Sequence, residues 1–141
     1  MVKTNWLINT VMIGLIPFIV RFIVFSFYKG SSTYFLFNEI DFILFGLVLN
    51  LSNINILEDD IKFGKEWEEE KKWIKQQKGV SLYFIIVFSA FLILAYLSEV
   101  VKTEQFNKMF FKISAITISF VALAISYSIF NRINKIANGK N

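Results

Sequence analysis

The sequence predicts an all-α membrane protein, a four-span transmembrane helical bundle that forms one domain over residues 1–141. Two observations predict this fold class. Hydrophobic residues make up 55% of the 141-residue chain, more than the roughly 45–50% that is usual in soluble domains. These residues gather in four long blocks separated by short polar stretches, and a helix needs about 20 such residues to cross the hydrocarbon of a bilayer.

The first block predicts a span over residues 6–28. Trp6 and Tyr28 stand at its two ends, where aromatic side chains anchor a helix at the membrane interface. Pro17 is the only proline, and it predicts a kink near the middle of the span because proline lacks a backbone donor. The block is too long for a signal peptide and contains Arg21, so we expect it to be retained.

The second block predicts a span over residues 34–57 that is polar on two sides. A helical wheel places Glu39, Gly46, Asn50 and Asn53 on one face, and Asp41, Ser52 and Asn55 on a nearly opposite face. Such a helix needs partners on both sides: its own subunit on one, and a second subunit or a water-filled lumen on the other. The membrane interface alone could accommodate Asn53 and Asn55, but not Asn50.

The stretch 58–79 is strongly charged and predicts an amphipathic helix between the second and third spans. Glu68 and Lys72, for example, stand one helical turn apart and can pair. Either this helix lies solvated on the membrane surface, or its apolar side docks a partner protein. The candidate docking residues are Phe63, Trp67, Trp73 and Ile74.

The third and fourth spans are predicted over residues 80–101 and 109–130. Small residues recur at four-three-four spacing in the last of them: Ala115, Ser119, Ala122 and Ser126. Such a stripe lets helices approach closely. It could serve packing within one subunit or association between subunits.

Basic residues indicate the orientation, because they are enriched in cytoplasmic flanks. Ten lie on the side of the N-terminus and four on the other side. The ten are Lys3, Lys62, Lys65, Lys71, Lys72, Lys75, Lys78, Arg132, Lys135 and Lys140, and the four are Lys29, Lys102, Lys108 and Lys112. We therefore expect both termini and the stretch 58–79 to be cytoplasmic, in a cell (inner or plasma) membrane.

Arg21 is the most informative residue of the spans. It precedes Tyr28 by seven residues, and Asp41 follows Tyr34 by seven, so both lie about 10 Å from the same membrane face at about 1.5 Å per residue. The two can meet, with Glu39 slightly shallower. The pair could lock two helices together, or it could belong to a charged ring that lines a passage. The candidate intramembrane polar network is Arg21, Glu39, Asp41, Asn50 and Asn53.

Several classes of function are not expected. The chain has no cysteine and no histidine, and no phosphate-binding glycine loop. We therefore predict no catalytic, cofactor or metal site, and no enzyme. The net charge of +4 comes from basic residues at membrane edges, so no nucleic acid is expected as a partner.

The first span resembles the start of RexB, a membrane ion-channel component of a phage-exclusion pair, in the runs Leu15-Ile16-Pro17-Phe18-Ile19-Val20 and Phe27-Tyr28-Lys29. The four-span layout resembles KwaA, the membrane component of the Kiwa defence system. These resemblances imply a homo-oligomeric membrane effector or sensor in antiviral defence that works with a cytoplasmic partner.

The function expected from the sequence is an oligomeric ion channel or membrane-perturbing effector of a bacterial anti-phage or toxin-like system. The alternatives are a non-conducting anchor that recruits a cytoplasmic partner through residues 58–79, and a bacteriocin-immunity-type membrane protein. A small-multidrug-type transporter is disfavoured, because its essential acid is missing from the first span.

Overall fold

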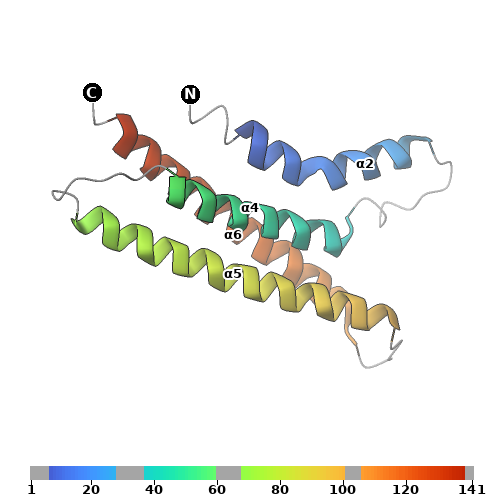
Figure 1. The fold of residues 1–141 in the computed structure, drawn as a ribbon. Helices are drawn as coiled ribbons and strands as arrows, with labels where there is room; N and C mark the ends of the chain where they lie inside the picture. Colours follow the sequence, from blue (N-terminus) through green and yellow to red (C-terminus); the bar gives the residue numbers. More distant parts are fainter. Residues whose placement is uncertain (1–6, 28–36, 60–67, 101–105, 139–141) are drawn as a thin grey trace.

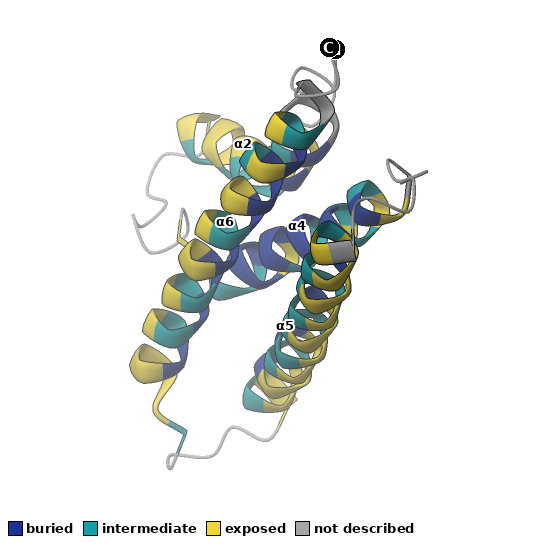
Figure 2. Cartoon of the chain, turned by 90° about the vertical axis from the view of Figure 1, so that its left-hand side faces the viewer, coloured by how far each residue is buried: buried dark blue, intermediate teal, exposed yellow. Residues whose placement is uncertain are grey.

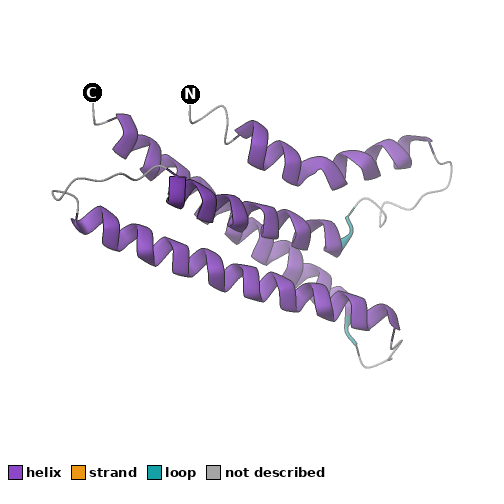
Figure 3. Cartoon of the chain, in the orientation of Figure 1, coloured by secondary structure: helices purple, strands orange, loops and turns teal. Residues whose placement is uncertain are grey.

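The computed structural model describes residues 7–27, 37–59, 68–100 and 106–138, and every regular element in these ranges is helical (Figure 3). In chain order these elements are η1 (Leu7–Met12), α2 (Ile13–Phe27), α4 (Glu39–Asp59), α5 (Glu68–Val100) and α6 (Lys108–Asn138). η1 and α2 together form the first span. Four helices are long and apolar enough to cross a membrane. This all-α architecture is that of a multi-pass membrane protein.

The helices run alternately in opposite directions (Figure 1). The start of η1, the end of α4, the start of α5 and the end of α6 lie at one end of the bundle. We call this the charged end and define it by Glu58, residues 68–78 and residues 131–136. At the opposite end, α2 finishes and α4 begins.

The central helix is α4, which packs against η1, α2, α5 and α6. Its span is 50% buried, whereas the first span is only 11% buried. Figure 2 shows this difference, with α4 mostly buried and the outer faces of α2 and α5 exposed. The exposed side chains of the outer helices include many large apolar ones, such as Phe22, Ile86 and Phe110, which suits contact with lipid.

Two asparagines define where helices begin. The Asn38 side chain accepts a 2.9 Å hydrogen bond from the backbone N–H of Ile40, and the Asn107 side chain accepts one of 3.0 Å from that of Phe110. A side-chain oxygen at the N-cap satisfies a backbone donor that the first turn leaves unpaired. The second span therefore starts at Glu39, later than the predicted residue 34.

Two helices are longer than the predicted spans. α5 has 33 residues and α6 has 31, which correspond to about 50 Å and about 46 Å at about 1.5 Å per residue, whereas the hydrocarbon is only about 30 Å thick. Residues 68–79, which we expected to form a separate surface helix, are the first turns of α5. The helical hydrogen bonds continue because this stretch is rich in Glu, Lys and Gln, which are good helix formers.

The first span changes from a π-helix to an α-helix about one turn before its proline. The π-helix η1 ends at Met12, and Pro17 follows inside α2. A proline ring inside a helix clashes with the carbonyl four residues earlier, which in this helix belongs to Ile13. Figure 1 shows α2 bent, as the single proline predicts.

Candidate functional site: polar contacts inside the bundle

The candidate site is the set of polar side chains that α4 carries on two faces. Asp41 and Ser52 bond to the first span, whereas Asn53 bonds to α6. Both polar faces of α4 therefore have partners within one chain. The sequence predicted the two faces but not that one subunit would serve both.

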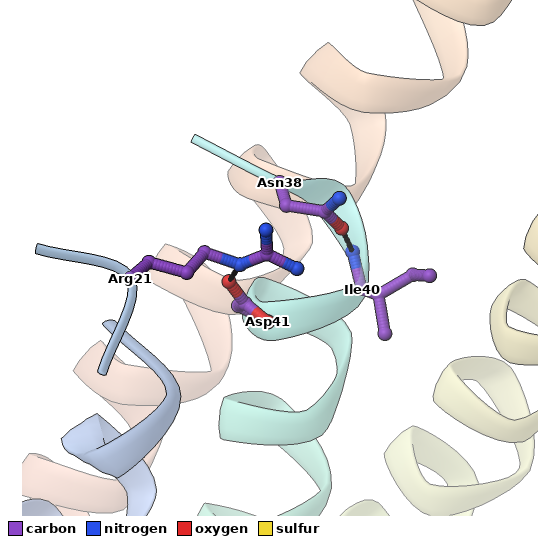
Figure 4. A network of polar contacts seen from close by, with 4 residues as sticks. All are labelled: Arg21, Asn38, Ile40 and Asp41. Carbon is purple, nitrogen blue, oxygen red and sulfur yellow. Dashed lines mark hydrogen bonds and ion pairs between the residues drawn. The ribbon is translucent and has the colours of Figure 1, made fainter. Parts of the chain in front are cut away.

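Arg21 of α2 and Asp41 of α4 form an ion pair in which Arg21 Nε donates to Asp41 Oδ2 (Figure 4). The side chain of Asp41 is only 6% exposed and that of Arg21 is 23% exposed. Asp41 lies in the first turn of α4, where the helix dipole also favours a negative charge. Sequence reasoning placed these two residues at one depth, and the structure brings them into contact.

Glu39 is the third charged residue of the predicted network. It lies in the same first turn, is half-buried, and has no ion pair with any residue that the structure describes. Glu39 therefore does not share in the Arg21–Asp41 ion pair.

Two further contacts hold the first span against α4. The hydroxyl groups of Thr10 and Ser52 share a hydrogen bond. Between this bond and the ion pair, Gly14 lies against Phe45, and a Cβ added at Gly14 would approach the ring to 2.7 Å. The first span is thus held to α4 at three levels. Thr10 and Gly14 were missed, although Gly14 could have been suspected as a site of close helix approach.

The second face of α4 packs tightly. Gly46 faces the ring of Phe88 in α5, and a Cβ at Gly46 would overlap that ring. The Asn50 side chain donates a 2.8 Å hydrogen bond to the carbonyl of Gly46. The Asn53 side chain donates a 2.9 Å bond to Ser126 Oγ in α6. Asn53 is buried between helices rather than exposed at the interface, whereas Asn55 is exposed.

The small-residue stripe of α6 packs inside the subunit. Its four members are at most 1% exposed: Ala115, Ser119, Ala122 and Ser126. Ser119 Oγ lies 2.6 Å from the carbonyl of Phe42 and 2.8 Å from that of Ala115, so one hydroxyl links α6 to α4. In the described chain the stripe is therefore covered by α4.

The predicted docking residues have different environments. Ile74 is 8% exposed and belongs to an apolar cluster with Leu57, Ile129 and Ile133. Trp73 is half-buried, and the guanidinium of Arg132 lies 4.5 Å from the centre of its ring. These two residues thus brace the charged end. Phe63 and Trp67 lie outside the described residues.

An apolar groove of about 370 Å³ lies between η1, α2, α4 and α6. Its lining residues are Val11, Leu15, Phe18, Phe42, Phe45, Ser119, Phe120 and Leu123. The one hydroxyl among them is engaged with carbonyl groups. This lining suits hydrocarbon.

Among the residues that the structure describes, no group of three or more acids could hold a metal ion. Comparison with known proteins adds no further assignment, because no family model, curated protein or solved structure matches the chain.

Proposed function

We propose that this protein is a non-conducting, multi-pass membrane anchor whose charged end lies in the cytoplasm and recruits a soluble protein partner. The observation that carries the proposal is the use of the intramembrane polar residues. Arg21 pairs with Asp41, Asn50 bonds to Gly46, and Asn53 bonds to Ser126. The first and third of these contacts join different helices of one subunit, and the second satisfies Asn50 within α4.

A pore between subunits would need polar groups on the outer faces of the spans. The outer faces carry mostly large apolar side chains, among them Phe22, Ile86 and Phe120, although Ser89 and Ser128 are also exposed. Among the exposed hydroxyl groups, those of Ser26 and Thr117 bond to carbonyl groups of their own helices at 2.8 Å. Such surfaces fit lipid better than a hydrated lumen.

The charged end supports recruitment because it is helical and braced from inside. The cluster around Ile74 joins α4, α5 and α6 there, and Lys78 pairs with Glu58 at 3.4 Å. Lys71, Lys72 and Lys75 are exposed on α5. These lysines, which follow the exposed Glu69 along α5, suit an acidic partner surface, with charge setting the encounter rate and specificity.

Ion flux decides between the anchor and a channel. The purified protein would be sized in detergent and reconstituted into liposomes with entrapped potassium and a potential-sensitive dye. We expect no flux above that of empty liposomes, at a protein density where a known pore-forming peptide discharges the vesicles. Flux that Asp41→Asn abolishes without changing the oligomer would refute the proposal.

Recruitment has its own test. A photo-crosslinking residue would be placed in cells at Lys71 or Lys75, and as a matched control at Ile86 on the lipid-facing part of the same helix. We expect one discrete protein adduct at the lysine positions and none at Ile86. The adduct should disappear when Lys71, Lys72 and Lys75 are all changed to Glu. Equal labelling at all three positions, or an adduct that survives the charge reversal, would contradict recruitment by this surface.

The second candidate is the oligomeric channel or membrane-perturbing effector. Glu39 favours it, because this half-buried acid lies in the first turn of α4 and has no ion pair with a described residue. A ring of subunits could place Glu39 at the mouth of a cation path. Flux that falls with Glu39→Gln but not with Glu99→Gln, an exposed acid at the same end of the bundle, would establish this candidate. The resemblance to anti-phage membrane proteins suggests bacterial defence as the setting for either function.

A further inference from the structure

Two buried polar atoms have no hydrogen-bond partner among the described residues: Asn53 Oδ1 in α4 and Ser81 Oγ in α5. Asn53 is 1% exposed and Ser81 is 0% exposed. Buried polar atoms without partners are rare in native proteins, because each loses its hydrogen bonds to water on folding. Two of them therefore require an explanation.

The packing register places these two atoms at the same level. α4 and α5 are antiparallel, and Gly46 faces Phe88. One heptad further along α4 is Asn53, and one heptad back along α5 is Ser81. Further toward the charged end, Lys78 of α5 pairs with Glu58 of α4, so the two helices remain in contact beyond Asn53. Residues seven apart return to nearly the same helix face, so the register set by Gly46 and Phe88 pairs Asn53 with Ser81.

The helix α6 also contributes a polar side chain here, since Asn53 Nδ2 donates a hydrogen bond to Ser126 Oγ. We call Asn53, Ser81 and Ser126 the polar node. Each is contributed by a different helix, and each is at most 1% exposed.

Apolar side chains close the polar node along the bundle axis. On one side lies the cluster that includes Phe88 and Ala122. On the side of the charged end lies the cluster of Leu57, Ile74, Ile129 and Ile133. Asn53 precedes Glu58 by five residues, or about 8 Å along a helix at about 1.5 Å per residue. The polar node is thus sealed, but it lies close to the end where water is available.

We propose that the polar node binds one water molecule, which bridges Ser81 Oγ and Asn53 Oδ1. Ser81 would donate to the water oxygen, and the water would donate to the Asn53 amide. If the amide is turned by 180°, its oxygen accepts from Ser126 and its NH2 group donates to the water. In both orientations one amide atom bonds to the water. Two to four polar partners are what buried waters use.

The chemistry of the polar node favours water over an ion. Its three side chains are neutral, and a buried cation needs a compensating charge. The acid closest along α4 is Glu58, which pairs with Lys78. This inference does not rest on the proposed function, because a structural water can serve an anchor or a channel.

The sign of one mutational effect tests the proposal. If water bridges the two groups, Ser81→Ala removes one hydrogen-bond partner of the water. The water is then held less tightly, and its hydrogen bond to the Asn53 amide is weakened. We then expect the folding equilibrium constant to fall by about 5- to 30-fold. If the site is dry, Ser81→Ala removes an unpaired hydroxyl and the protein becomes more stable. The matched control is Ser89→Ala, on the exposed side of the same helix, which should change little.

A structure of the wild-type protein in nanodiscs, at a resolution that shows ordered water, gives a second readout. We expect a solvent peak within hydrogen-bonding distance of both Ser81 Oγ and the Asn53 amide. Three results would each overturn the proposal: a stability gain for Ser81→Ala, an effect no larger than that of Ser89→Ala, or a direct Ser81–Asn53 hydrogen bond with no solvent between them.

Discussion

Removing one partner of the Arg21–Asp41 pair should destabilise the protein far more than removing one partner of Lys78–Glu58. The two pairs offer a comparison within one chain. The first has side chains that are 23% and 6% exposed, and the second has side chains that are 33% and 58% exposed. The matched substitutions are Arg21→Met with Lys78→Met, and Asp41→Asn with Glu58→Gln.

The expected magnitudes follow from the surroundings of each pair. Breaking a buried pair leaves one charge unpaired in a medium of low dielectric constant, which costs about 3–5 kcal/mol. An exposed pair contributes about 0–1 kcal/mol, because water screens it. The double variant Arg21→Met/Asp41→Asn removes both charges of the pair, so its cost should be smaller than the sum of the single costs. We expect a coupling energy of about 2–3 kcal/mol for the first pair and below about 1 kcal/mol for the second.

Reversible unfolding in mixed micelles measures these values. The mole fraction of dodecyl sulfate would be raised in steps while far-ultraviolet circular dichroism follows the loss of helix. Each cycle needs the wild type, two single variants and the double variant. Coupling energies that agree between the two pairs within about 0.5 kcal/mol would refute the claim that Arg21–Asp41 joins α2 to α4 in a desolvated environment.

Two further predictions use the same assay. Gly46→Ala should lower the free energy of unfolding by about 1–3 kcal/mol, because the new Cβ meets Phe88. Gly79→Ala, where nothing lies within 4 Å, should raise it by about 0.5–1 kcal/mol. Equal effects at the two glycines would contradict the close approach of α4 and α5. Ile74→Ala should cost about 2–5 kcal/mol because Ile74 is buried at the charged end, and a cost below about 0.5 kcal/mol would mean that Ile74 faces outward, as a docking residue would.

Much of the fold could be predicted because the membrane imposes a simple rule. Backbone polar groups in hydrocarbon must be satisfied within each segment, so four long apolar blocks imply four helices. The matched depth of Arg21 and Asp41 followed from counting residues along helices joined by a short connection. The helix α5 begins earlier and α6 ends later than the spans predicted for them. The reason is that hydropathy detects the part of a helix that contacts lipid and not the part that continues into water.

The roles of the polar residues could not be predicted, because they depend on how the helices pack. Asn50, Asn53 and the small stripe of α6 were compatible with a lumen, a second subunit or internal packing. In the structure they bond within α4 or between α4 and α6 of the same chain. Ser81 could have been found from its heptad spacing with Ile74 and Phe88, but a serine in a span is too common to single out.

The linear order of apolar and charged residues thus decides that the chain is helical and can cross a membrane four times, because hydrophobic length is a local property. Tertiary structure alone decides which polar groups meet, because helix rotation and register bring together residues that are far apart in the chain. Asn53 and Ser126 are separated by 73 positions. Their contact exists only because α4 occupies the centre of the bundle, where both of its polar faces find partners.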